Sequence, residues 1–185
     1  PVGPDMYTVT YAINLTNTGG TATTYGLTDT PLFGVGTTVT GGSCVATGSG
    51  AASCAGVTGV PAPSWTVAAA GTPIAAGGSH TYTITVSFTV APGSLTSDGN
   101  DCSLATGSTT NTGLLNRATM TPAGGSAINQ DACAPIPAAV SHTKVVTSGP
   151  TPTGLNAYTV TYAINVGNTG GTASTYGLTD TPLFG

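Results

Sequence analysis

The chain has 185 residues and a formal net charge of −4, and only 4% of its residues are charged: six Asp, one Lys and one Arg. Clustered Lys and Arg bind nucleic acids and anionic membranes, so we expect neither partner. No apolar run is long enough to span a bilayer, so we expect no direct membrane insertion. Disorder goes with low hydrophobicity, whereas 39% of this chain is hydrophobic and arranged in periodic runs, so we expect it to fold.

In chain order, the first clear element is a strand over residues 7–15, in which apolar side chains occupy every second position. The same alternation runs through residues 80–90, where Thr or Ser separates the apolar positions. Such a pattern places one face of a strand in the core and the other in water. Shorter candidate strands lie at residues 25–30, 35–40, 64–68, 114–121 and 140–146. Seven or eight short strands of this kind predict an all-β fold, an antiparallel β-sandwich.

Four cysteines stand at Cys44, Cys54, Cys102 and Cys133, without the close pairing that is typical of zinc sites. We therefore predict two disulfides, Cys44–Cys54 and Cys102–Cys133, because each pair brackets a stretch rich in small and polar residues. Disulfides persist in oxidising compartments, so we expect an extracellular or cell-surface protein with no metal and no cofactor.

A long internal repeat dominates the sequence. Residues 5–34 and 156–185 differ at five of thirty positions, and the offset between them is 151 residues. A period of this length suits a complete domain better than a single solenoid turn. The chain is therefore expected to hold one full period and the opening of the next, as in a tandem array.

Four motifs in this order resemble a repeat domain of bacterial surface proteins: YTVTY from Tyr7, NTGG from Asn17, LTDTP from Leu27 and NRAT from Asn116. That family is a conserved repeat of unknown function with an immunoglobulin-like sandwich, found in tandem in adhesins, stalks and surface layers. In it a Lys-bearing strand precedes the YTVT strand, a part that Lys144 would play here. The resemblance implies that residues 1–137 form a sandwich repeat without its first strand and that 138–185 open the next repeat. Periodicity alone leaves open the other phase, in which residues 140–146 close the preceding domain.

The sharpest chemical hypothesis is a self-formed isopeptide cross-link, which needs a buried Lys, an Asn and a nearby carboxyl group. Burial favours the neutral, nucleophilic Lys amine. Strand parity places Lys144, Asn116, Asp29 and Asp180 on the apolar faces of their strands, where polar residues are uncommon. In the phase that the family implies, Lys144 would pair with an Asn of the following repeat and Asn116 with a Lys of the preceding one. The alternative is structural, because an inward Asp or Asn can bind backbone groups and a Lys can extend to solvent.

No arrangement of nucleophile, base and acid is evident around His80 or His142, so we expect no enzymatic activity. The favoured function is a structural module of a stalk, sheath or fibre. Its partners would be neighbouring repeats of the same chain, with lateral self-association into filaments. The alternative is an adhesin module that binds a glycan or host protein through a loop at residues 41–60 or 97–112. The Pro-containing residues 134–137 predict a short, semi-rigid connection into the next domain.

Overall fold

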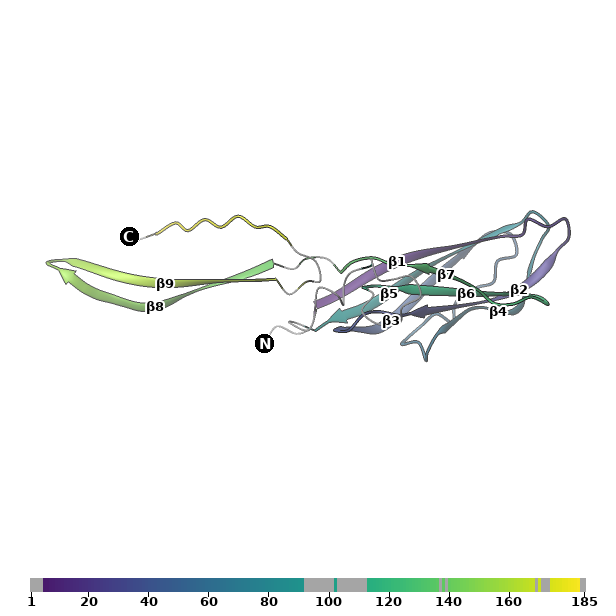
Figure 1. Cartoon of the computed structure of the whole chain (residues 1–185), viewed down its shortest axis with the longest axis horizontal. Coiled ribbons are helices and arrows are strands. Elements are labelled where there is room, and N and C mark those ends of the chain that lie inside the picture. Colours follow the sequence, from purple (N-terminus) through teal and green to yellow (C-terminus); the bar gives the residue numbers. More distant parts are fainter. Residues whose placement is uncertain are drawn as a thin grey trace.

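A computed structural model of the chain describes residues 5–91, 102, 113–136, 138, 140–168, 170 and 174–183. Within these residues the chain forms nine strands and no helix (Figure 1). The prediction of an all-β fold is therefore confirmed. The strands are β1 (Asp5–Thr16), β2 (Thr23–Pro31), β3 (Thr37–Thr47), β4 (Trp65–Ile74), β5 (Ser79–Val90), β6 (Asn116–Pro122), β7 (Ile128–Ala132), β8 (Val140–Gly154) and β9 (Ala157–Asn168).

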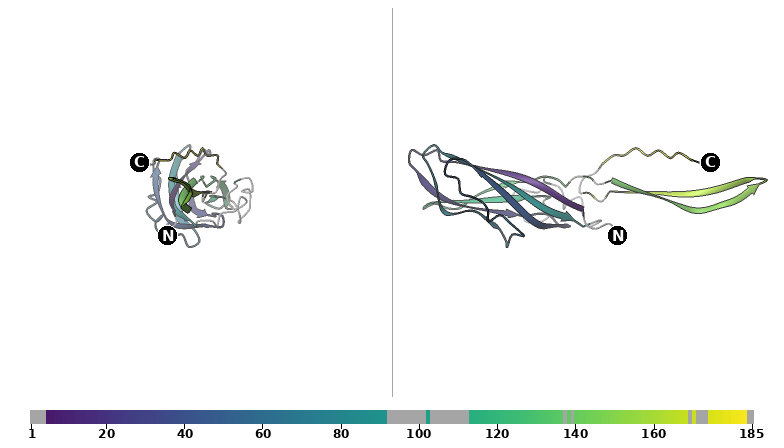
Figure 2. Two further views of the ribbon diagram at one scale, coloured as in Figure 1. Left: turned by 90° about the vertical axis from the view of Figure 1, so that its left-hand side faces the viewer. Right: turned by 180° about the vertical axis from the view of Figure 1, so that it is seen from behind.

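Seven of the strands form two antiparallel sheets that pack against each other as a sandwich (Figure 2). One sheet has the order β1-β5-β3 and the other the order β4-β2-β6-β7. β1 and β5 pair along their whole length, from Asp5 opposite Val90 to Thr16 opposite Ser79. Among the described strands β1 pairs with β5 alone, so β1 is an edge strand of its sheet.

The core lies between the two sheets and follows from the alternation in the sequence. On β5 the apolar side chains from Tyr82 to Val90 are at most 3% exposed, while the Thr and Ser side chains between them reach solvent in part. The opposite sheet contributes Leu27, Val67 and Trp65, which are equally buried. Burying one such side chain stabilises the fold by about 1.5–3 kcal/mol, so this layer is the main source of stability.

Several elements differ from the sequence predictions. The proposed binding loop at residues 41–60 is wrong in its first part, because β3 continues through Gly41 and Gly42 to Thr47. The Trp65 ring occupies the space beside Gly42, where a Cβ atom would stand 2.6 Å from Cζ2. The glycine is thus a packing requirement within a strand and not a sign of a loop. Trp65 itself is a core residue, and its indole nitrogen donates a hydrogen bond to the Thr58 carbonyl at 3.2 Å.

The strand β7 was not predicted, because its residues INQDA show little alternation and every one of them is exposed. Polar cross-strand contacts hold it on β6. Arg117 binds Asp131 through two hydrogen bonds of 2.7 and 2.8 Å, and the Thr119 hydroxyl donates to Asn129 at 2.8 Å. The strand β4 also runs further than expected, to Ile74.

The second copy of the repeat opens with a separate antiparallel hairpin, β8–β9, which extends beyond one end of the sandwich (Figure 1). β9 repeats the sequence of β1. It pairs with β8, and in this register Lys144 lies opposite Ile164. Residues 174–183 repeat residues 23–32 but form no strand.

Candidate functional site

Both predicted disulfides are present with the predicted pairing. Cys44 and Cys54 are joined with a Cα–Cα distance of 5.7 Å, and Cys102 and Cys133 with a distance of 5.8 Å. The first disulfide ties the end of β3 to the loop that leads toward β4, and Cys54 is 3% exposed. Two disulfides are typical of proteins that fold in an oxidising environment.

The structure brings two of the predicted cross-link residues together inside the sandwich. Asp29 on β2 and Asn116 at the start of β6 are 1% and 2% exposed, as their strand parity predicts. The Asn116 amide nitrogen donates a hydrogen bond of 3.1 Å to Asp29 Oδ2. The other amide atom, Asn116 Oδ1, is buried and has no hydrogen-bond partner among the described residues. A buried carbonyl oxygen without a partner costs about 1–3 kcal/mol, so this acceptor is unusual in the interior of a sandwich.

The surroundings of Asp29 favour its protonated form. Burial raises the pKa of Asp29 from 3.8 to about 6, although the hydrogen bond from Asn116 partly opposes the shift. Burial, together with the nearby negative charge of Asp29, also raises the pKa of Tyr11. The Tyr11 hydroxyl donates to the Leu114 carbonyl at 2.6 Å. Asp29 therefore sits in an apolar setting where it can hold or pass on a proton near neutral pH.

The other two predicted residues meet in the second copy. Lys144 Nζ lies 2.5 Å from Asp180 Oδ1 and 4.4 Å from the centre of the Tyr162 ring. Both side chains are partly exposed, at 35% and 45%. Lys144 belongs to the hairpin and Asn116 to the sandwich, so the structure does not bring this Lys and this Asn together (Figure 1).

A groove with a volume of about 640 Å³ opens beside Asn116, the hydrogen-bond partner of Asp29. One wall is the edge of β1, where the consecutive residues 11–17 all line the space. The opposite wall is the inner side of β6 and β7, with Asn116, Ala118 and Ile128 among its residues. Successive side chains of a strand point to opposite faces of its sheet, so a run of consecutive lining residues indicates that the edge of β1 forms this wall.

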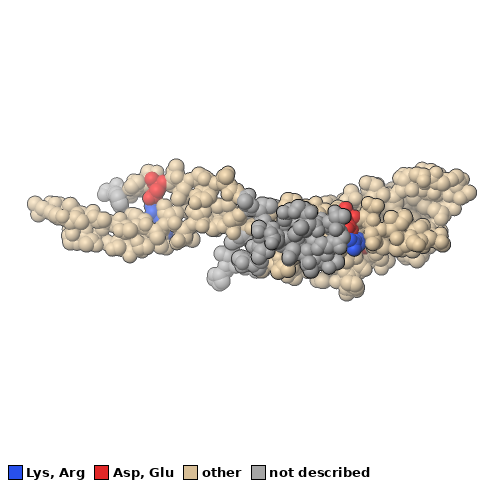
Figure 3. All heavy atoms as spheres, viewed as in Figure 1, with Lys and Arg blue, Asp and Glu red and all other residues tan. Residues whose placement is uncertain are grey.

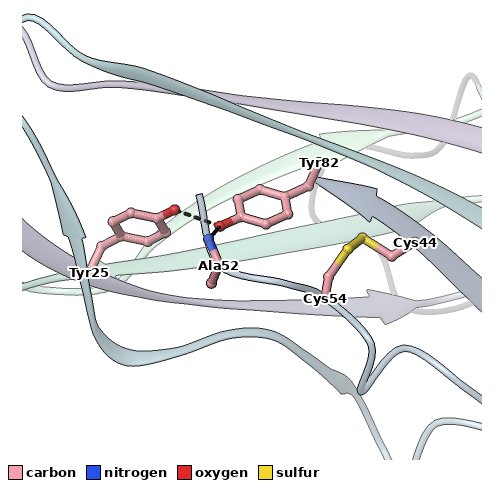
Figure 4. The surroundings of a disulfide bond; sticks show 5 residues. All are labelled: Tyr25, Cys44, Ala52, Cys54 and Tyr82. Carbon is pink, nitrogen blue, oxygen red and sulfur yellow. Dashed lines mark hydrogen bonds between the residues drawn. A yellow bond between two sulfur atoms is a disulfide. The ribbon is translucent and has the colours of Figure 1, made fainter. Parts of the chain in front are cut away.

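A second buried polar cluster was missed by the sequence analysis. Tyr25 Oη lies 2.7 Å from His80 Nδ1 and 2.8 Å from Tyr82 Oη, and His80 Nε2 lies 3.0 Å from the Ser49 carbonyl. The Ala52 amide donates to Tyr82 Oη at 3.2 Å (Figure 4). These distances fit one continuous chain of donors, from the Ala52 amide through both hydroxyls to the imidazole, whose Nε2–H donates to Ser49. The sequence signal was the inward parity of His80 and Tyr82 on β5.

This cluster has a structural role. It joins β2 and β5 to the loop that carries Cys54, so hydrogen bonds and the disulfide hold the same loop (Figure 4). His80 is 1% exposed and both of its nitrogens have partners, which leaves it no access to a substrate.

Charge is sparse on the described surface. Figure 3 shows a face on which charged side chains gather at two places, and the ion pairs are Arg117–Asp131 and Lys144–Asp180. Among the described residues no group of three His, Cys, Asp or Glu side chains could hold a metal ion. Nor does the described part of the chain contain a helix long and apolar enough to cross a membrane.

Comparisons with known proteins yield no match to a family model, to a curated protein or to a solved structure.

Proposed function

We propose that the chain is a structural repeat module of an extracellular bacterial surface protein, with immunoglobulin-like sandwiches in series that form a stalk, sheath or fibre. The observation that carries this proposal is the repeat itself. A stretch that forms β1 and β2 of a sandwich returns 151 residues later in nearly identical form, and its first strand is again a β-strand, β9.

The pairing of the hairpin supports the phase in which residues 140–146 open a new domain. β8 pairs with β9, the copy of β1, and with none of the other described strands. A segment that closed the preceding domain would instead pair within that domain's sheets. The domain unit would then begin near Val140, and each connection between units would fall just before it.

The construction of the sandwich also suits a structural role outside the cell. The stretch between Cys44 and Cys54 is fastened to the core by the disulfide and by the Tyr82 hydroxyl, not presented to solvent as a free loop. Val57, in the same loop region, is 1% exposed. These contacts favour a spacer over an adhesin module at this loop. The second proposed binding loop, residues 97–112, lies outside the described residues except for Cys102.

Electron microscopy of a chain of several full repeats tests the proposal. We expect elongated modules in a row, either as single rods or packed side by side, since few surface charges oppose lateral contact. A glycan- and protein-binding screen on the same material is the companion measurement. Compact, unconnected globules together with a saturable ligand would favour the adhesin function and reject the structural one.

A further inference from the structure

The groove that Asn116 lines is bounded on one side by the end of β1, a strand whose second edge is unpaired among the described strands. We propose that residues 140–146 of the preceding copy of the repeat fill this groove, and that the Lys they carry forms an isopeptide bond with Asn116. The inference deepens the proposed structural role by adding a covalent bond to it, and the test below can fail independently of that role.

The repeat identifies both the occupant and its register. β9 is the copy of β1, and residues 162–168 of β9 pair with residues 140–146 of β8. Subtracting the offset of 151 residues converts 162–168 into 11–17, the stretch of β1 whose edge lines the groove. The open edge of β1 and the paired edge of β9 are thus the same stretch of the repeat. A strand equivalent to residues 140–146 would fit along this edge by ordinary antiparallel pairing.

The same register points the Lys side chain into the sandwich. Lys144 lies opposite Ile164, the copy of Ile13, and residues opposite each other in an antiparallel pair project to the same face. Ile13 packs against the hydrophobic core and lines the groove. A Lys at this position would therefore enter the groove from the β1 side, toward the wall formed by β6.

Contacts in both copies of the repeat indicate that a Lys entering the groove would reach Asp29 and Asn116. In the second copy Lys144 binds Asp180, the copy of Asp29, and lies over Tyr162, the copy of Tyr11. In the first copy the negative charge of Asp29 helps to raise the pKa of Tyr11, so the two side chains are near each other. Asp29 also accepts a hydrogen bond from Asn116. Asn116 lines the groove, and its buried Oδ1 lacks a partner. The Lys amine of an inserted strand would supply the missing donor.

The reaction is balanced without any further reactant. The buried Lys ammonium transfers a proton to the Asp29 carboxylate. The transfer is favoured because the apolar setting disfavours the charged forms of both groups. The protonated carboxyl group polarises the Asn116 amide, and the Lys amine attacks its carbonyl carbon. The bond between this carbon and the amide nitrogen then breaks. The departing nitrogen takes one proton from the attacking amine and one from Asp29, and it leaves as ammonium, which returns Asp29 to its carboxylate form. The net change is one amide exchanged for another, with no oxidation or reduction, and Asp29 ends as it began.

The test extends the full chain by a copy of residues 138–151 placed directly before Pro1. Pro1 corresponds to Pro152 in the repeat, so this extension restores the natural register without a linker. After folding, intact-mass measurement should show the loss of one ammonia. Digestion should yield a branched peptide that joins the added Lys to Asn116. The extended chain should also migrate faster than its linear form on a denaturing gel after the disulfides are reduced.

Matched variants separate the bond from the fold. Changing the added Lys to Arg keeps the charge and all native residues of the sandwich, and it should abolish the mass loss. Asn116→Ala should do the same, and Asp29→Asn should slow cross-linking by about 10²–10⁴-fold, the usual contribution of a positioned acid–base group. A folded extended chain that keeps its full mass, or a bond to any residue other than Asn116, would overturn the inference.

Discussion

At the scale of single residues, the most informative feature is a carboxyl group that the fold keeps in an apolar interior. Asp29 is 1% exposed and is bound by an amide, Asn116, that is itself incompletely hydrogen-bonded. Proteins rarely bury a carboxyl group without full compensation, because desolvation of the charged form costs several kcal/mol. In this sandwich the destabilising group lies at the position where the proposed cross-link would form.

Burial of Asp29 predicts an unusual dependence of stability on pH. Its pKa is about 6 in the folded state, against 3.8 for an unperturbed group, so the folded chain binds more protons than the unfolded chain between these values. The free energy of unfolding should therefore fall as the pH rises from about 4 to 7, by at most about 3 kcal/mol. Urea unfolding at several pH values measures this change.

The matched variant for this prediction is Asp29→Asn, which keeps the size of the side chain but cannot titrate. Its stability should vary much less over the same pH range. Asp131 acts in the opposite direction, because its hydrogen bond to Arg117 lowers the pKa of Asp131 and favours the charged form. That pair is partly exposed and contributes little. A wild-type profile that is flat or rises over this range contradicts the assignment.

At the scale of elements, the packing of β3 on β4 depends on one glycine. Gly42 faces the Trp65 ring, and a Cβ atom there would stand 2.6 Å from it, whereas at the neighbouring Gly41 the nearest atom would be 3.9 Å away. We expect Gly42→Ala to lower the free energy of unfolding by about 1–3 kcal/mol, the usual cost of overpacking a core. The Trp65 fluorescence should shift as the ring is displaced.

Gly41→Ala is the control, since both changes alter the same strand and the same residue type. It should change stability by about 0.5 kcal/mol or less, because a Cβ atom there would meet only an ordinary van der Waals contact. Equal effects of the two substitutions would show that backbone conformation, and not the Trp65 contact, makes these glycines necessary.

The elements also show how far the sequence could be interpreted. Strict alternation identified β1 and β5, because one face of each is buried. The same parity argument located Asp29 and Asn116 in the interior. It found the start of β3 but missed residues 41–47, where the packing of Trp65 requires a glycine that is typical of loops. It also missed β7, which polar cross-strand contacts stabilise without burial. The Tyr25–His80 cluster was missed since its partners Ser49 and Ala52 offer backbone atoms, which carry no sequence signal.

At the scale of the whole molecule, the connection between the sandwich and the hairpin decides whether an array is stiff. Three of the four residues 133–136, where the chain leaves the sandwich, are bonded to it or buried in it. Cys133 is bonded to Cys102, the Ala134 carbonyl accepts a hydrogen bond of 2.9 Å from the Leu114 amide, and Ile136 is fully buried against Phe88 and Val90. Since β8 begins at Val140, only residues 137–139 separate a fixed exit from the next strand.

We therefore expect a chain of two full repeats to keep a defined distance between its sandwiches. Pro137 fixes one backbone dihedral in this short stretch, and three residues give little freedom for the second unit to swing. Small-angle scattering should show a separate second maximum in the distance distribution. Inserting a Gly/Ser stretch after residue 138 should broaden or erase this maximum, while the same insertion at the β6–β7 turn, beside Gly124, should leave it in place. A broad distribution in the unaltered chain would mean that the repeats are tethered flexibly, and an array built from them could not transmit orientation along a stalk or fibre.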